Sequence, residues 1–300
     1  MANCKFCNST AIIKRGKRKQ KQTYYCKGCK RRFTLSLRKN YDSNIILQAI
    51  SYYNLGNSLE QSKKLIKKKF KANLSKSAIS NWLKDFKDII PYNKLRKNIL
   101  SRHGKDIIAS KLFKHKGLTY NYKYHKGKLD FCKYNNLINY LKEINQNFPH
   151  EFFEKDQRCS DIKININSLN KIKINYASNL AKIILDNIQD NNKRHELIEN
   201  FMLINDSCTI ATEIPIWFYD KNIGGICGHI DILQNRFGKI HILDFKPEAD
   251  KENKKKVASQ LYLYALGLSF RTGISLSEFR CAWFDADNYY EFEPDKIRVY

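Results

Sequence analysis

The chain has 300 residues and 42% of them are hydrophobic, so it is long enough for two or three domains with ordinary cores. No stretch approaches the ~18 uninterrupted apolar residues of a membrane span, and the first residues lack the apolar core of a signal peptide. This excludes a disordered tail and a membrane-spanning protein, and we expect a cytoplasmic protein with no membrane partner.

The net charge of +26 is concentrated at one end of the chain. Residues 1–100 carry 25 Lys and Arg against 4 Asp and Glu, residues 101–200 carry 18 against 11, and residues 201–300 carry 12 against 14. A bias toward lysine throughout the sequence would spread the charge evenly. The gradient is instead typical of a nucleic-acid-binding region joined to a domain of another kind.

Four of the nine cysteines form two tight pairs near the N-terminus. Cys4 and Cys7 are separated from Cys26 and Cys29 by a spacing that closes one tetrahedral zinc site. Short strands are expected at residues 12–13 and 23–25, with a basic loop at residues 14–21. A redox dithiol is the alternative, and a second pair in so short a module argues against it.

The next stretch has the periodicity of three short helices. Asp42 can cap the first, Ser58 and Gln61 form a capping box for the second, and Ser75 begins the third. This predicts a helix-turn-helix, with a plain helical linker as the alternative. The residues of the third helix expected to face DNA are Lys76, Ser77, Asn81 and Lys84.

Residues 1–90 carry motifs that resemble a known class of DNA-binding protein. The motifs are Cys4-x-x-Cys7, Tyr24-Tyr25-Cys26-Lys27-Gly28-Cys29-Lys30-Arg31-Arg32-Phe33, Tyr53-x-x-Gly56-x-Ser58 and Ser77-x-x-Ser80-x-Trp82. Together they resemble the zinc ribbon and helix-turn-helix of insertion-sequence transposase DNA-binding proteins. The resemblance implies binding of duplex DNA, and it does not imply transposition.

Aromatic and basic residues alternate in the middle of the chain, between residues 111 and 131. Phe113, Tyr120, Tyr122 and Tyr124 could form a hairpin that stacks on bases, or an ordinary amphipathic strand pair. The histidines of this region are too widely spaced to indicate a metal site. We assign no role to this region.

From residue 179 the lysine content falls and strand patterns appear. We expect a helix over residues 180–204, strands over 209–218, 226–234 and 239–246, a helix over 254–271, and strands over 279–284 and 289–292. Arg236 and Gly238 lie in a tight turn between the second and third strands. The order helix, three strands, helix, strand predicts a mixed sheet flanked by helices.

Two acidic residues fall together on this scaffold. Asp244 and Lys246 are two apart on one strand and share a face, and Asp231 lies opposite Asp244 across the expected hairpin. Buried carboxylates at the ends of apolar strands are costly without a cation, and a magnesium ion would satisfy them. From Asp244-Phe245-Lys246 alone, a structural ion pair between Asp244 and Lys246 is the stronger interpretation.

A wider sequence pattern favours the metal site over the ion pair. The pattern consists of Glu213, Gly228-His229-Ile230-Asp231, Ile242-Leu243-Asp244-Phe245-Lys246 and Gln260-Leu261-Tyr262-Leu263-Tyr264. They resemble the RecB-like branch of the PD-(D/E)XK nuclease superfamily, over residues 180–293. The resemblance implies that Asp231 and Asp244 bind Mg²⁺ or Mn²⁺, and that Lys246 is catalytic.

The same resemblance suggests further site residues. Gln260 and Tyr264 occupy the places of the branch's Gln-x-x-x-Tyr helix, and their spacing puts them on one helix face. His195 could be an additional metal ligand or an ordinary helix residue, and Glu213 could support the metal. Some members of the branch hold an iron–sulfur cluster on cysteines after the nuclease motifs. Only Cys281 is present there, so no cluster is predicted.

These patterns predict a multidomain α+β protein. Its parts are a zinc ribbon at 1–38, a helix-turn-helix at 40–90, a middle region at 91–178 and a restriction-endonuclease-like α/β nuclease domain at 179–300. We expect a metal-dependent deoxyribonuclease of a mobile-element or defence system, without a prediction of oligomeric state. The alternatives are a DNA-binding regulator or transposition accessory protein with an inactive nuclease-like domain and, more weakly, a nuclease that acts on RNA.

Overall fold

A computed structural model describes residues 4, 7, 9–18, 21–34, 41–164, 170–172, 175–185 and 194–297. The chain divides into two compact units, Met1–Ile46 and Leu47–Tyr300. Each unit is described by itself. The boundaries expected at residues 90 and 178 both fall inside the second unit, which is mixed α+β.

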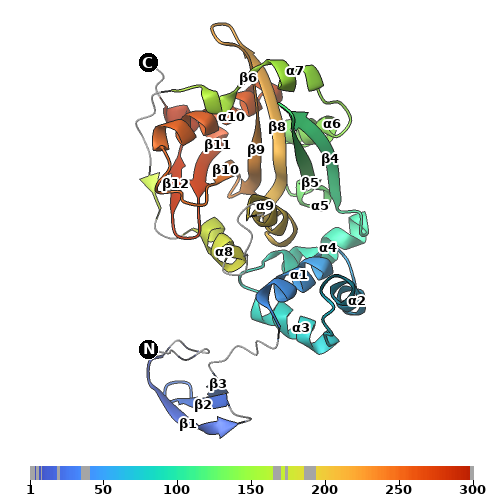
Figure 1. The fold of residues 1–300 in the computed structure, drawn as a ribbon, viewed down its shortest axis with the longest axis vertical. Coiled ribbons are helices and arrows are strands. Elements are labelled where there is room, and N and C mark those ends of the chain that lie inside the picture. Colours follow the sequence, from blue (N-terminus) through green and yellow to red (C-terminus); the bar gives the residue numbers. More distant parts are fainter. Residues whose placement is uncertain are drawn as a thin grey trace. The chain divides into compact units, whose positions relative to one another are not determined.

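The first unit holds a small antiparallel sheet (Figure 1). Its strands are β1 (Ile12–Arg18), β2 (Lys21–Cys26) and β3 (Arg32–Thr34). The basic loop expected at residues 14–21 is wrong for residues 14–18, because β1 continues through them with a register irregularity between Lys14 and Lys17. Gly16 lies within it at a φ of 70°, a conformation that suits a bulge.

Four helices follow. They are α1 (Ser43–Asn54), α2 (Leu59–Phe70), α3 (Lys76–Asp85) and α4 (Tyr92–His103). The predicted capping box is confirmed, because Ser58 Oγ accepts from the Gln61 backbone N–H at 3.1 Å and Gln61 Oε1 accepts from the Ser58 N–H at 2.9 Å. Ser75 caps α3 in the same way, with Oγ accepting from the Ala78 N–H. These caps explain why the helices begin where the sequence predicts.

A nine-stranded mixed sheet forms the body of the second unit, in the order β4-β5-β8-β9-β10-β11-β12-β7, with β6 paired to β9. Its strands are β4 (Ile108–His115), β5 (Leu118–His125), β6 (Gln157–Arg158), β7 (Asn170–Lys171), β8 (Thr209–Asp220), β9 (Gly224–Arg236), β10 (Lys239–Phe245), β11 (Phe279–Phe284) and β12 (Tyr289–Phe292). In Figure 1 the long β8–β9 hairpin runs through the middle of the sheet, with β4 and β5 on one side and β10 to β12 on the other.

The remaining helices pack against this sheet or connect its strands. They are α5 (Lys126–Leu129), α6 (Asn135–Ile144), α7 (His150–Lys155), α8 (Tyr176–Leu185), α9 (Arg194–Asn205) and α10 (Lys254–Thr272), with short 3₁₀ turns at Cys159–Asp161, Leu276–Glu278 and Pro294–Lys296. The helix expected over residues 180–204 coincides in part with α8 and α9, and its residues 186–193 lie outside the described residues.

The expected hairpin between β9 and β10 is confirmed. Arg236 pairs with Lys239 across a two-residue turn, in which Phe237 and Gly238 have φ angles of 50° and 71°. Two successive positive φ angles are the geometry of the turn that matches the twist of paired strands. The turn fixes the register of the hairpin. The last recorded pair is Leu243 with Ile232, so the next residues along the two strands, Asp244 and Asp231, lie opposite each other.

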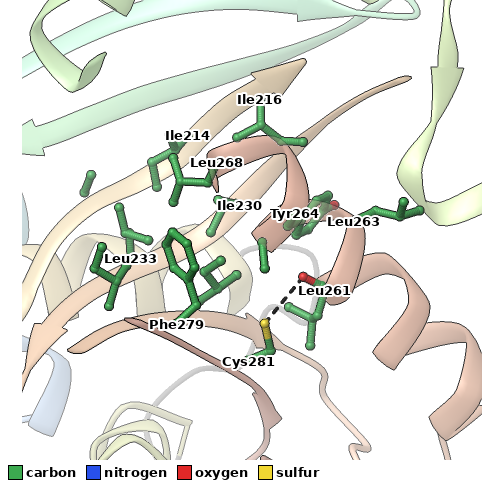
Figure 2. Packing of buried hydrophobic residues seen from close by; sticks show 14 of the residues in the cluster. Ile214, Ile216, Ile230, Leu233, Leu261, Leu263, Tyr264, Leu268, Phe279 and Cys281 are labelled. Atoms are coloured by element: carbon green, nitrogen blue, oxygen red, sulfur yellow. Dashed lines mark hydrogen bonds between the residues drawn. The ribbon is translucent and has the colours of Figure 1, made fainter. Parts of the chain in front are cut away.

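Helix α10 covers part of the sheet with an apolar face. Figure 2 shows this core, in which the labelled side chains come from β8 (Ile214, Ile216), β9 (Ile230, Leu233), α10 (Leu261, Leu263, Tyr264, Leu268) and β11 (Phe279, Cys281). Gly267 lets α10 approach β8 closely, since a Cβ there would lie 2.8 Å from Ile216 Cδ1. This packing holds the Gln260 and Tyr264 face of α10 in a fixed relation to the sheet.

Candidate functional site

The four N-terminal cysteines come together in the first unit. Their sulfur atoms all lie within 4.8 Å of one another. Cys4 Sγ lies 3.6 Å from Cys29 Sγ, and Cys7 Sγ lies 3.5 Å from Cys26 Sγ. Tetrahedral zinc with bonds of about 2.3 Å places sulfur atoms roughly 3.8 Å apart. The cluster is therefore compatible with a structural zinc site of the kind found in zinc ribbons.

A second group of metal-ligand type lies in the large unit. His195, Glu199 and Asp231 each offer one ligand atom within 4.8 Å of the other two. His195 and Glu199 are four residues apart on α9 and so share one helix face. Asp231 comes from β9, and its Oδ2 lies 3.8 Å from His195 Nδ1. This nitrogen and these carboxylates form a donor set that suits Mg²⁺ or Mn²⁺.

Asp244 and Lys246 stand beside this group on and just after β10. Asp244 is 1% exposed, and Lys246 Nζ lies 2.9 Å from its Oδ2. That contact lacks hydrogen-bond geometry, and within the described part of the chain neither Asp244 oxygen has a hydrogen-bond partner. A buried carboxylate with unsatisfied oxygens is costly unless a cation or donor completes it.

The group borders a cavity of about 390 Å³. Six of the predicted site residues line it, and they are His195, Glu213, Asp231, Lys246, Gln260 and Tyr264. Asp244 is not among the lining residues and reaches the site through its contact with Lys246. Residues from segments far apart in the sequence thus converge on one hollow, whose size suits a small ligand or a short piece of a polymer.

Glu213 reaches the cavity from an unusual backbone conformation. Its φ is 52°, inside the 12-residue strand β8, where a residue with a side chain rarely adopts a positive φ. Its Oε2 lies 2.7 Å from His229 Nδ1 on β9. Strained conformations of this kind persist where the surrounding structure enforces them, and they occur preferentially at functional sites.

Gln260 and Tyr264 form a hydrogen-bonded pair on α10. Gln260 Nε2 donates to the Tyr264 hydroxyl at 2.7 Å. Gly228 makes room for the tyrosine ring, because a Cβ at position 228 would lie 2.6 Å from Tyr264 Cε1. Burial raises the pKa of Tyr264 well above its ordinary value, so its hydroxyl stays protonated at neutral pH. The pair therefore offers neutral polar groups to the cavity.

The pKa values of the three buried acids Asp231, Asp244 and Glu199 are shifted in different directions. Burial raises the pKa of Asp231, but the neighbouring side chains of His195 and Asp244 and the charge of Lys246 outweigh it, so the net shift is downward. Burial and the charge of Asp231 together raise the pKa of Asp244 well above its usual range. Burial and the charges of Glu213 and Asp231 do the same to the pKa of Glu199. A divalent cation would favour the charged form of all three.

Lys246 is a cation at neutral pH. Burial lowers its pKa, but the charges of Asp244 and Asp231 outweigh burial and raise the pKa to about 12. A protonated amine cannot accept a proton from water. Lys246 is therefore a hydrogen-bond donor and a positive charge at the edge of the cavity.

The cavity also contains residues that the sequence analysis did not assign to the site. They are Glu199 at the carboxylate group, and His115, Tyr120, Arg158, Cys159, Ser160, Cys227 and His229 along the rest of the wall. Glu199 was a further candidate helix acid, since it follows His195 by four residues. Tyr120 stood out only as part of the aromatic and basic hairpin, and Arg158 had no signal, because β5 and β6 join the sheet through pairings distant in sequence.

The residues expected to face DNA lie together on one exposed surface. Lys76, Ser77, Asn81 and Lys84 are all exposed on α3, and Ile79 and Trp82 of the same helix are buried. The face is thus available to a partner.

Comparison of the chain with models of protein families, with characterised proteins and with solved structures finds no match. In the described part of the chain, no helix is both long and apolar enough to cross a membrane.

Proposed function

We propose that the protein is a divalent-metal-dependent DNA nuclease. The observation that carries this proposal is the convergence on one cavity of His195, Asp231 and Lys246, with Asp244 in contact with Lys246. Separate segments supply these groups, which are the types that phosphodiester hydrolysis needs. An ion pair at a strand end, the simpler interpretation of Asp244 and Lys246, does not account for His195 and Glu199 beside Asp231.

The residues present fit a hard divalent cation. Oxygen ligands about 2.1 Å from Mg²⁺ lie at most about 4.2 Å apart, close to the 4.8 Å that bounds the group of His195, Glu199 and Asp231. The unsatisfied oxygens of Asp244 are a second indication, because they lie buried beside this group. We propose that Asp231 and Asp244 bind the cation together with Glu199 and His195.

Each remaining residue has a role that follows from its chemistry. The bound cation would polarise the phosphodiester and offset negative charge on the leaving oxygen. Lys246, protonated and 2.9 Å from Asp244, would stabilise the charge that builds on the phosphoryl oxygens. Gln260 and Tyr264 would orient the strand through neutral hydrogen bonds. The contact between Glu213 and His229 would hold the histidine at the cavity wall.

The order of helices and strands supports the assignment of a restriction-endonuclease-like fold. Helix α9, strands β8, β9 and β10, helix α10 and strand β11 follow one another in the order expected of a PD-(D/E)XK nuclease core. We propose that this core is restriction-endonuclease-like. We further propose that the Cys4 to Cys29 zinc ribbon and the exposed face of α3 bring it to duplex DNA.

A cleavage assay with matched variants tests the proposal. The purified protein, incubated with DNA and Mn²⁺, is expected to cut it, and Asp231→Asn and Asp244→Asn are expected to lower the rate by about 100-fold or more. Asp250→Asn is the control, because Asp250 is exposed and lies outside the cavity lining. Undiminished cleavage by the Asp244 variant would overturn the proposal.

Calorimetric titration with Mn²⁺ separates the nuclease from the alternative. The nuclease requires binding that Asp231→Asn abolishes. A protein that binds duplex DNA but neither binds the metal nor cuts the DNA would instead be a regulator or accessory protein with an inactive nuclease-like domain.

A further inference from the structure

The cavity also holds a guanidinium group, that of Arg158, which the nuclease motifs do not include. Arg158 lies on β6, which pairs in parallel with the beginning of β9 and places Arg158 beside Cys227. Its side chain lines the same cavity as Asp231 and Lys246. Among the described residues, no carboxylate lies within ion-pair distance of Arg158.

Hydrogen bonds hold the guanidinium of Arg158 in place. Its Nε donates to His115 Nε2 at 3.2 Å, and its Nη2 donates to the His115 carbonyl oxygen at 3.4 Å and approaches the Tyr120 hydroxyl at 3.5 Å. The contact from Nε requires His115 to be neutral. Burial and the charges of Arg158 and His229 lower the pKa of His115 to about 3, which satisfies that requirement at neutral pH.

These contacts use only part of the donor capacity of Arg158. A guanidinium has five N–H groups, and the two on Nη1 have no hydrogen-bond partner within the described residues. A fixed guanidinium with open donors in a cavity is a site for an oxyanion, and its planar fork matches a phosphate. Ser160 also lines the cavity, and its hydroxyl donates to Asp161 Oδ1 at 3.4 Å.

We propose that Arg158, which hydrogen bonds to His115 hold in place, binds the phosphate next to the one that is cleaved. This rests on the proposed function, because it assumes that the cleaved phosphate lies at Asp231 and Lys246. One cavity of about 390 Å³ then takes two successive phosphates of one strand. Asp231 and its neighbours would hold one phosphate through a metal ion, and Arg158 would fix the register of the strand by binding the next phosphate.

The first test compares two substrates with and without a neighbouring phosphate. Thymidine trinucleotide has two phosphodiesters, whereas bis(4-nitrophenyl) phosphate has only the one that is cleaved. In Arg158→Gln, the ratio of kcat/KM for the trinucleotide to kcat/KM for the small diester is expected to fall about 10- to 100-fold. Arg158→Lys keeps the charge without the planar fork and should give an intermediate ratio.

The second test locates the phosphate by neutralising each one. Trinucleotides with a methylphosphonate at the first or at the second linkage are bound in Ca²⁺ and measured by calorimetry. The wild-type protein should lose affinity with both, whereas Arg158→Gln should be insensitive at one linkage and remain sensitive at the other. Equal sensitivity of both proteins at both linkages would overturn the proposal.

Controls separate the inference from the proposed function and from misfolding. Lys155→Gln removes one charge at an exposed site three residues before Arg158 and should behave as wild type. Thermal melting checks that the Arg158 variants are folded. Failure of the wild type to hydrolyse either substrate with Mn²⁺ would count against the nuclease. An unchanged ratio and unchanged trinucleotide affinity in Arg158→Gln would count against the phosphate subsite alone.

Discussion

The side-chain amide of Asn54 donates to Asn205 Oδ1 at 2.8 Å, and at most 1% of either residue is exposed. Asn205 in turn donates to Ser51 Oγ at 2.8 Å and to the Phe201 carbonyl oxygen at 3.1 Å. The contact joins the end of α1 to the end of α9, although 151 residues separate the two asparagines. The helix that carries His195 and Glu199 is therefore anchored to the helical region that precedes the sheet.

Replacement of Asn205 by leucine should destabilise the protein by about 1–3 kcal/mol, because the buried amide of Asn54 loses its partner. Urea denaturation measures the free energy of unfolding. The double variant Asn54→Leu, Asn205→Leu should cost less than the sum of the two single variants, since no polar group is then left without a partner. Additive losses would show that the two amides are not coupled.

Replacement of Glu199 by glutamine should weaken Mn²⁺ binding about 10- to 100-fold, because one carboxylate of the proposed ligand group loses its charge. Calorimetric titration measures the affinity. Glu196→Gln is the matched control, since Glu196 is exposed on the same helix and lies outside that group. Equal losses in both variants would indicate a general electrostatic effect instead of coordination by Glu199.

The elements that the sequence predicted are those whose signals are local. Strands β11 and β12 have the predicted bounds, and α10 differs from its prediction by one residue. The Ser58 capping box and the turn at Gly238 depend on residues a few positions apart. Caps, two-residue turns and apolar periodicity act within a few residues, so a single sequence contains them.

The extent of the sheet could not be predicted in this way. Lys123 of β5 pairs with Thr212 of β8, which comes 89 residues later in the sequence. Gln157 of β6 pairs with Ile226 of β9, which comes 69 residues later. No local pattern encodes such pairings, because they depend on which strand edge is free when the sheet forms. Arg158 was missed for this reason.

The wild-type protein should contain one zinc ion per chain, and Cys26→Ser should contain none. Within the described part of the first unit, the buried hydrophobic cluster consists of Cys4 and Cys26 with Ile12, Tyr24 and Cys29 packed against it. So small a core needs the metal for its folding free energy. Atomic emission spectroscopy measures the zinc content. Cys132→Ser, a buried cysteine of the second unit, should retain zinc.

Two buried histidines should make the free energy of unfolding fall as the pH drops below about 6.5, whereas the raised pKa values of Asp244 and Glu199 act in the opposite direction. Burial and then the charge of Lys128 lower the pKa of His125 to about 2, and burial and then the charges of Arg236 and Arg280 lower the pKa of His241 to about 4. Both histidines are neutral when folded and bind a proton when unfolded. Each adds a slope of up to about 1.4 kcal/mol per pH unit between its unfolded and folded pKa.

Urea denaturation at pH 7, 6 and 5 measures this slope. His241→Gln should flatten it, because the unfolded chain then has one proton fewer to gain. His150→Gln removes an exposed histidine and should leave the slope as in the wild type. Equal slopes in the wild type and in His241→Gln would contradict the expected burial cost of His241.

At position 213, selection for stability and selection for activity favour different residues, because Glu213 has a positive φ. Glycine reaches a φ of 52° with little strain, so a screen for heat tolerance alone would favour Glu213→Gly. The same change would remove the carboxylate that contacts His229 at the cavity wall. Related proteins that need the activity should therefore keep an acidic residue at position 213 despite its conformational cost. Related proteins that have lost the activity should instead carry glycine or asparagine there.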